Sequence, residues 1–103
     1  MQVEIRARNL ELTRALQAHA ERRLQFALGR FGSRIDRVVV RLADLNGPGG
    51  GVDKRCRIAV GLIRSKSVVV DDRDADLYTA VDRAADRAGR CVARLLTRDR
   101  ELS

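Results

Sequence analysis

The sequence is poor in aromatic side chains, and this scarcity bounds both its core and its ligands. Tryptophan is absent, and only Phe26, Phe31 and Tyr78 carry rings among the 103 residues. The core must therefore be built mainly from valine, leucine, isoleucine and alanine. Three rings are also too few to stack along a row of bases, which argues against that mode of single-strand binding.

Histidine and cysteine are equally scarce, which leaves little for catalysis. His19 is the only histidine, and no serine or cysteine has a catalytic partner near it in sequence, so we expect no enzyme, no metal and no cofactor. We assign His19 to a helix surface or core edge. Cys56 and Cys91 lack the spacing of a CxxC pair or a metal site. We expect two reduced, buried thiols, with a disulfide or a reactive thiol as the alternative.

Long apolar runs are missing as well. The β-branched runs at residues 38–40 and 68–70 fall far short of the roughly 20 residues that a bilayer-spanning helix needs. The charged N-terminus lacks the apolar stretch of a signal peptide. These absences predict a cytoplasmic protein without a membrane partner. At this length we expect residues 1–103 to form a single domain.

Positive charge, in contrast, is abundant. The chain has 21 basic and 14 acidic residues, a formal net charge of +7, and all but two of the basic residues are arginines. The planar guanidinium fork suits phosphate oxygens, and the self-repulsion of so basic a domain must be offset by counterions or a polyanion. The composition therefore favours nucleic acid as the partner and gives no sign of a small-molecule substrate.

The hydrophobic pattern predicts an α+β fold with the order β-α-β-β-β-α. Alternating apolar residues predict strands at residues 2–8, 35–43, 56–62 and 68–70. Apolar spacings of three and four predict helices at residues 13 to about 31, with Thr13 as cap and Gly32 as stop, and from about 75 to 98. One-sided alternation lets both helices cover one face of a four-stranded sheet.

Two segments between these elements resemble ligand sites only superficially. The glycine-rich residues 46–51 lead into a strand and lack a following Lys-Ser/Thr, so we expect a flexible hairpin rather than a phosphate cradle. The acidic residues 71–76 lack the glycine and terminal glutamate of an EF-hand loop, so we expect a helix-capping cluster rather than a Mg²⁺ or Ca²⁺ site.

The second predicted helix carries a stripe of arginines. At 100° per residue they fall within about 80° of one another, beside the apolar face, and span roughly 22 Å, enough to follow several phosphates. The alternative is a solvated face in which Asp86 pairs with Arg90. Gly89, inside the same helix, marks close packing, an approach to RNA, or drift. The members of this arginine stripe are Arg83, Arg87, Arg90, Arg94 and Arg98.

Further arginines extend the candidate interface beyond this stripe. Arg23 and Arg30 are seven residues apart and share one flank of the first helix, and Arg8 lies on the outer face of the first strand. We therefore predict a nucleic-acid interface formed by these three residues together with the arginine stripe.

Two short motifs open the predicted helices. Asp76-Leu-Tyr-Thr-Ala-Val-Asp82 fits D-[ML]-Y-x-A-[IV]-D, and Asn9-Leu-Glu-Leu-Thr-Arg-Ala-Leu16 fits N-x-E-[IL]-T-x-A-[LI]. In both, the sequence resembles the ribosome hibernation promoting factors and ribosome-associated translation inhibitors, also called sigma-54 modulation proteins. The similarity runs from residue 1 to about 98.

The resemblance implies a protein that occupies the mRNA and tRNA channel of the small subunit in 30S or 70S ribosomes. There it would contact 16S rRNA through Arg87, Arg90, Arg94 and Arg23 and block translation under stress or in stationary phase, by occupancy alone. The chain stops at Ser103 and so resembles the short form, without a C-terminal dimerisation domain. Whether it promotes or prevents the pairing of ribosomes into 100S particles stays open.

Two other hypotheses remain. The α-β-β-β-α portion of the layout resembles a double-stranded RNA-binding domain (dsRBD), so a general duplex-RNA binder is one. A regulatory protein-interaction module that needs no nucleic acid is the other.

Overall fold

The computed structural model describes residues 1–45 and 53–102, with side chains through residue 100. The predicted α+β class and the β-α-β-β-β-α order are confirmed, with one added 3₁₀ helix. The predicted hairpin at residues 46–51 lies outside the described residues. In chain order the elements are β1 (Gln2–Arg8), α1 (Arg14–Leu28), η1 (Gly29–Arg34), β2 (Ile35–Asp44), β3 (Lys54–Leu62), β4 (Val68–Asp74) and α2 (Leu77–Leu102).

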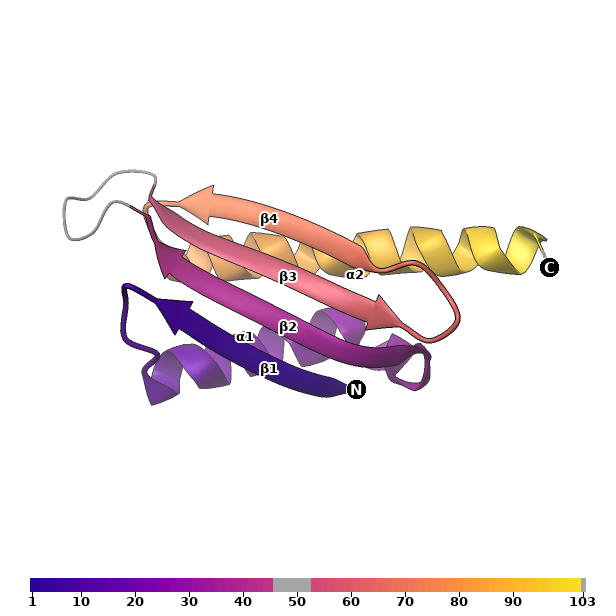
Figure 1. Ribbon diagram of the computed structural model, residues 1–103, viewed down its shortest axis with the longest axis horizontal. Coiled ribbons are helices and arrows are strands. Elements are labelled where there is room, and N and C mark those ends of the chain that lie inside the picture. The colour runs from indigo at the N-terminus through magenta and orange to yellow at the C-terminus, as the bar shows by residue number, and fades with distance from the viewer. Residues whose placement is uncertain (46–52, 103) are drawn as a thin grey trace.

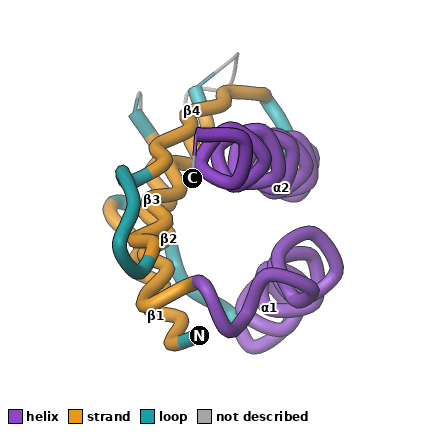
Figure 2. Tube along the Cα trace, turned by 90° about the vertical axis from the view of Figure 1, so that its right-hand side faces the viewer, coloured by secondary structure: helices purple, strands orange, loops and turns teal. Residues whose placement is uncertain are grey.

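The four strands form one sheet in the order β1-β2-β3-β4. β1 pairs parallel with β2, whereas β2 with β3 and β3 with β4 are antiparallel (Figure 1). Both helices pack on the same face of this sheet, as predicted, and the opposite face is left uncovered (Figure 2). Neither described helix is both long and apolar enough to pass through a bilayer.

The core fills the space between the sheet and the two helices, and it is aliphatic as predicted. From α1 it takes Leu16, Ala20, Leu24 and Leu28, spaced four apart, which are at most 4% exposed. The sheet adds the inward members of each alternation, and α2 adds mostly small residues that let it lie close to the strands. The sheet and α2 residues are Ile35, Val38, Val40, Leu42, Cys56, Ile58, Val60, Leu62, Val68, Val70, Ala80, Val81, Ala84, Ala85, Ala88, Val92 and Leu96.

The first helix begins where predicted and ends earlier. Thr13 caps it, since its Oγ1 accepts a hydrogen bond from the Leu16 amide at 3.1 Å. The helix stops at Leu28 and the chain continues as the 3₁₀ turns of η1 to Arg34, so the predicted end near residue 31 is wrong. Glycines 29 and 32 lower the helical propensity of this segment, which then follows the tighter path into β2.

The segment around residues 71–76 also differs from the prediction. β4 runs to Asp74 rather than ending at residue 70, because residues 71–74 continue the ladder against β3. Only Asp76 caps α2: its carboxylate accepts from the Tyr78 amide at 3.1 Å and from the Thr79 hydroxyl at 2.9 Å. The other three aspartates belong to the strand, so the predicted capping cluster is wrong for them.

Candidate nucleic-acid interface

The arginine stripe follows the outer side of α2, with every member exposed. The predicted helical period is thus confirmed, because a stripe displaced from the apolar positions must face solvent. The surroundings of its members differ along the helix, since β4 runs beside the first turns of α2.

The first two members of the stripe are held by carboxylates of the protein itself. Arg83 Nη2 lies 3.1 Å from Asp72 Oδ1 and 2.8 Å from Asp74 Oδ2. Arg87 Nη1 lies 3.4 Å from Asp72 Oδ2, and its Nη2 donates to the Asp71 carbonyl at 2.8 Å. We call Arg83 and Arg87 the paired half of the stripe. Their guanidinium groups fasten α2 to β4.

The other three members have no such partner. Within the described residues, none of the ion pairs involves Arg90, Arg94 or Arg98, which we call the unpaired half. Arg94 Nη2 makes one weak contact, donating to Cys91 Sγ at 3.4 Å. The pairing of Asp86 with Arg90 that a solvated face would use is not formed, since Asp86 binds Arg23 instead. These three guanidinium groups are available to an anion.

Arg23, the α1 residue predicted to face rRNA, lies between the two helices and is also engaged. Its Nη2 is 2.9 Å from Asp86 Oδ1, and its Nε is 3.4 Å from Asp82 Oδ1. His19 joins the same cluster, with Nε2 2.6 Å from Asp82 Oδ1 and its ring edge-on to Tyr78 at 4.8 Å between centroids. Arg23 and His19 therefore connect α1 to α2, and the core-edge assignment of His19 agrees with its place here.

A shallow hollow opens between the helices beside the unpaired half. It measures about 300 Å³ and is lined by Phe26, Ala27, Arg30, Asp86, Gly89 and Arg90. Arg30 stacks on Phe31 at 4.6 Å from the ring centroid, and Phe26 is 80% exposed. Arg30 lies in η1 and not on the first helix as predicted, and it borders this concave surface together with Arg90 of α2.

Gly89 explains how the helices come this close. A Cβ at this position would lie 2.8 Å from the Ala27 carbonyl oxygen, a distance that side chains do not tolerate. Of the three origins considered for this glycine, close packing is the one that the structure favours.

The last predicted site residue, Arg8, lies apart from the others. It is exposed on the uncovered face of the sheet, and it borders a hollow of about 380 Å³ together with Arg6, Arg41, Arg57 and the half-buried Arg55. The predicted interface therefore divides between two sides of the molecule. The alternation in the sequence placed these additional arginines on the outer sides of their strands, but only cross-strand register brings them together.

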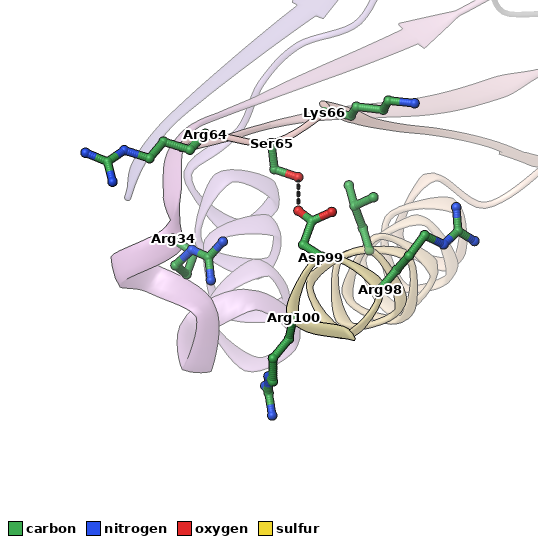
Figure 3. A pocket seen from close by; sticks show the side chains of 8 residues that line it. Arg34, Arg64, Ser65, Lys66, Arg98, Asp99 and Arg100 are labelled. Carbon is green, nitrogen blue, oxygen red and sulfur yellow. Dashed lines mark hydrogen bonds between the residues drawn. The ribbon is translucent and has the colours of Figure 1, made fainter. Parts of the chain in front are cut away.

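A hollow of about 600 Å³ lies at the C-terminal end of α2 and is also basic. Its lining includes Arg34, Arg64, Lys66, Arg98 and Arg100. Figure 3 shows that Arg64 and Arg100 direct their guanidinium groups away from it. At its centre the Ser65 hydroxyl donates to Asp99 Oδ2 at 2.5 Å, which ties the β3–β4 turn to α2 (Figure 3). The charged groups that line this hollow therefore do not converge on a single point.

The cysteines carry no catalytic arrangement. Both are free thiols, Cys56 buried and Cys91 half-buried. Burial, together with the nearby carboxylates of Asp72 and Asp71, raises the pKa of Cys56 to about 12, so this thiol stays protonated and unreactive. Across the described residues, no group of three or more histidine, cysteine or acidic side chains is placed to hold a metal ion.

Comparison with known proteins gives a consistent result. The profile of the family described as sigma 54 modulation protein / S30EA ribosomal protein matches residues 3–100. The N-terminal domain of Protein Y from Thermus thermophilus is 34% identical, with a TM-score of 0.75 over 91% of this chain and 98% of that one. A ribosomal subunit interface protein from Coxiella burnetii has the same fold, at 15% identity and a TM-score of 0.72 over 96% of this chain and 98% of that one. No curated protein matches.

Proposed function

We propose, since this chain belongs to the sigma 54 modulation protein / S30EA ribosomal protein family, that it binds the small ribosomal subunit in the mRNA and tRNA channel and blocks translation. It acts there by occupancy, in the cytoplasm and under stress or in stationary phase, and no bond is made or broken. The match over residues 3–100 and the Protein Y N-terminal domain at 34% identity support the ribosome as partner.

The unpaired half of the arginine stripe is the observation that carries the proposal. Arg90, Arg94 and Arg98 repeat on one side of α2 without a carboxylate in the described part of the chain, and Arg30 adds a fourth charge across the hollow. Four arginines on four phosphates of 16S rRNA contribute about −3 to the slope of log affinity against log salt. A fourfold rise in salt then weakens binding roughly 50-fold.

The paired half of the stripe and Arg23 have a different role in this proposal. Arg83, Arg87 and Arg23 already bind aspartates, so transferring them to rRNA would leave those carboxylates unpaired beside a polyanion. We assign them to holding α2 against β4 and α1, which presents the unpaired half to rRNA.

Competition on purified ribosomes tests the site. We expect the protein to co-sediment with 30S subunits and 70S ribosomes in sucrose gradients and to lose binding when mRNA and initiator tRNA are loaded first. Undiminished binding to the loaded ribosomes would place the protein outside the channel. Preference for a simple RNA duplex over 30S subunits would instead indicate a general double-stranded RNA binder, and binding that survives ribonuclease would indicate a protein partner.

The same gradients report on function and on ribosome pairing. A cell-free translation reaction should slow in proportion to the bound fraction, because mRNA cannot enter an occupied channel. Accumulation of 100S particles, or its absence, then separates the two behaviours of the short family members.

A further inference from the structure

The uncovered face of the sheet places arginines directly opposite one another. The register pairs Arg6 with Arg41 across β1 and β2, and Arg41 with Arg57 across β2 and β3. The next outward row consists of Arg8, Ala43, Arg55 and Arg73. We call these two rows, with Asp71 at the end of the first, the arginine rows. Their neighbours along each strand point into the core, so the rows lie on the other face of the sheet, and Figure 2 shows that both helices cover the core face.

The arginines that stand opposite one another within each row repel each other in the folded protein. Side chains directly opposite on adjacent strands have Cβ atoms about 5 Å apart, and like charges at that distance destabilise a sheet. The rows hold six arginines against a single aspartate. Nothing in the fold requires charge at these outward positions, because the adjacent row on the same face is formed by Glu4, Val39, Ala59 and Val69.

Carboxylates neutralise only two of the six arginines. Arg55 binds Asp71, which keeps the pKa of that carboxyl below its ordinary value, and Arg6 binds Glu4, an acceptor that Arg37 shares. Within the described residues, no ion pair reaches the four remaining members of the rows, although Arg57, opposite Asp71, and Arg73 also help to lower the pKa of that carboxyl. Those four are Arg8, Arg41, Arg57 and Arg73.

We propose that the arginine rows are a second RNA-binding surface, one that binds backbone phosphates through Arg8, Arg41, Arg57 and Arg73. A hollow of about 380 Å³ on this face offers a concave surface for an RNA backbone. It is bordered by Arg6, Arg8, Arg41, Arg55 and Arg57. The outward positions of all four strands lack an aromatic ring, so the contact is with phosphates and not with stacked bases.

The inference rests on the proposed function and extends it. With the unpaired half of the stripe on one side and the arginine rows on the other, the domain would bridge two RNA segments rather than lie against one. A polyanion on the rows would also relieve the repulsion within them.

Salt dependence tests the rows directly. The variant Arg41→Gln/Arg57→Gln removes two charges from their centre, and Arg14→Gln/Arg34→Gln removes two exposed charges elsewhere. Affinities for purified 30S subunits and for naked 16S rRNA are measured over a salt series. For Arg41→Gln/Arg57→Gln the slope of log affinity against log salt should become shallower by about 1.4, the contribution of two phosphate contacts. Arg14→Gln/Arg34→Gln should keep the slope of the unaltered protein.

Thermal unfolding of the same variants supplies an independent measurement. At low salt Arg41→Gln/Arg57→Gln should unfold at the same temperature as the unaltered protein or higher, because cross-strand repulsion is relieved. A shallower slope in a variant that folds at least as well supports a phosphate contact.

The opposing results are distinct. Equal slopes for both variants on both targets overturn the second surface, and so does weaker binding with an unchanged slope, which would indicate a protein contact. The channel hypothesis fails separately, when loaded mRNA and tRNA do not reduce binding of the protein. In that case, a difference between the two variants in the salt slope on naked 16S rRNA still supports the arginine rows. Unaltered protein that binds neither target overturns both.

Discussion

The two halves of the arginine stripe share a residue type, a helix and a spacing, yet they face different partners. Arg83 and Arg87 lie beside β4 and bind its carboxylates at 2.8–3.4 Å. Arg90, Arg94 and Arg98 lie farther along α2, where the described residues offer them no carboxylate. A charged helical stripe can thus hold the fold together at one end and, among the described residues, lack a carboxylate partner at the other, and only the neighbouring strand distinguishes the two.

Charge reversal in the unpaired half should break binding most severely. The variant Arg90→Glu/Arg94→Glu/Arg98→Glu sets three carboxylates against phosphates, and each like-charge contact of this kind is costly. We expect a loss of affinity for 30S subunits of roughly 100-fold or more, measured by co-sedimentation. The matched reversal Arg14→Glu/Arg34→Glu/Arg64→Glu should lose far less. Equal losses in both variants would mean that overall charge, and not the stripe, drives binding.

Gly89, between the two halves, should be the next most sensitive position. Gly89→Ala puts a Cβ 2.8 Å from the Ala27 carbonyl oxygen, and overpacking costs about 1–3 kcal/mol against about 1 kcal/mol gained by removing a helical glycine. At the middle of the overpacking range the net cost is about 1 kcal/mol, which lowers the thermal midpoint by about 4–8 °C, measured by circular dichroism. Gly61→Ala, whose Cβ would lie 3.6 Å from the Arg37 carbonyl oxygen, should be tolerated. A midpoint that rises in Gly89→Ala, as removal of an unconstrained helical glycine would cause, would contradict the tight approach of the helices.

Neutralising the paired half should affect stability more than binding. For Arg83→Gln/Arg87→Gln we expect a fall in thermal midpoint of about 2–5 °C, in the range of partly exposed ion pairs, and less than a threefold change in affinity for 30S subunits. Asp72→Asn provides a matched contrast, because it removes the carboxylate that Arg83 and Arg87 share while leaving both charges intact, with Arg83 still paired to Asp74. It should lower the midpoint in the same way but bind ribosomes more tightly at low salt. A large loss of affinity in Arg83→Gln/Arg87→Gln would place the paired half on rRNA.

Acid should weaken the attachment of the paired half to β4. The pKa of Asp74 lies below its ordinary value of 3.8, chiefly because the Asp76 amide donates to this carboxylate at 2.8 Å, with Arg83 beside it. A carboxyl whose pKa is lower in the folded than in the unfolded state contributes stability above pH 3.8 and loses that contribution as the pH falls further. Urea unfolding between pH 4 and 2 should therefore depend less on pH in Asp74→Asn than in the unaltered protein. Asp36→Asn, on an exposed carboxylate, should keep the original dependence, and identical curves for all three proteins would contradict the assignment.

The sequence was sufficient for the parts of the molecule that repeat locally. Apolar periods of two and about 3.6 predicted the four strands, the two α-helices, the face that each α-helix buries and the exposed stripe, but not η1. The predicted features follow from the geometry of a single strand or helix. Thr13 as a cap followed from the same local chemistry.

The pairing of charges could not be predicted in this way. Aspartate is a poor strand former, so the sequence of residues 71–74 indicates the approach to a helix. Only the ladder with β3 places Lys54 opposite Asp74 and Arg57 opposite Asp71. Because the predicted strand ended at residue 70, the prediction did not place the carboxylates that bind Arg83 and Arg87 beside the second helix. The contacts from Arg23 to Asp86 and from His19 to Asp82 each join residues 63 positions apart, and no local period records them.

The parallel placement of β1 governs the order in which the protein assembles. β1 touches the sheet only through β2, and the whole of α1 and η1 separates the two strands, whereas β2, β3 and β4 are successive antiparallel neighbours. Closing the longer loop costs more chain entropy before any contact compensates for it. The three-stranded meander should consequently form first and β1 dock last. In native-state amide exchange, the protons of β1 should be the first of the four strands to be lost.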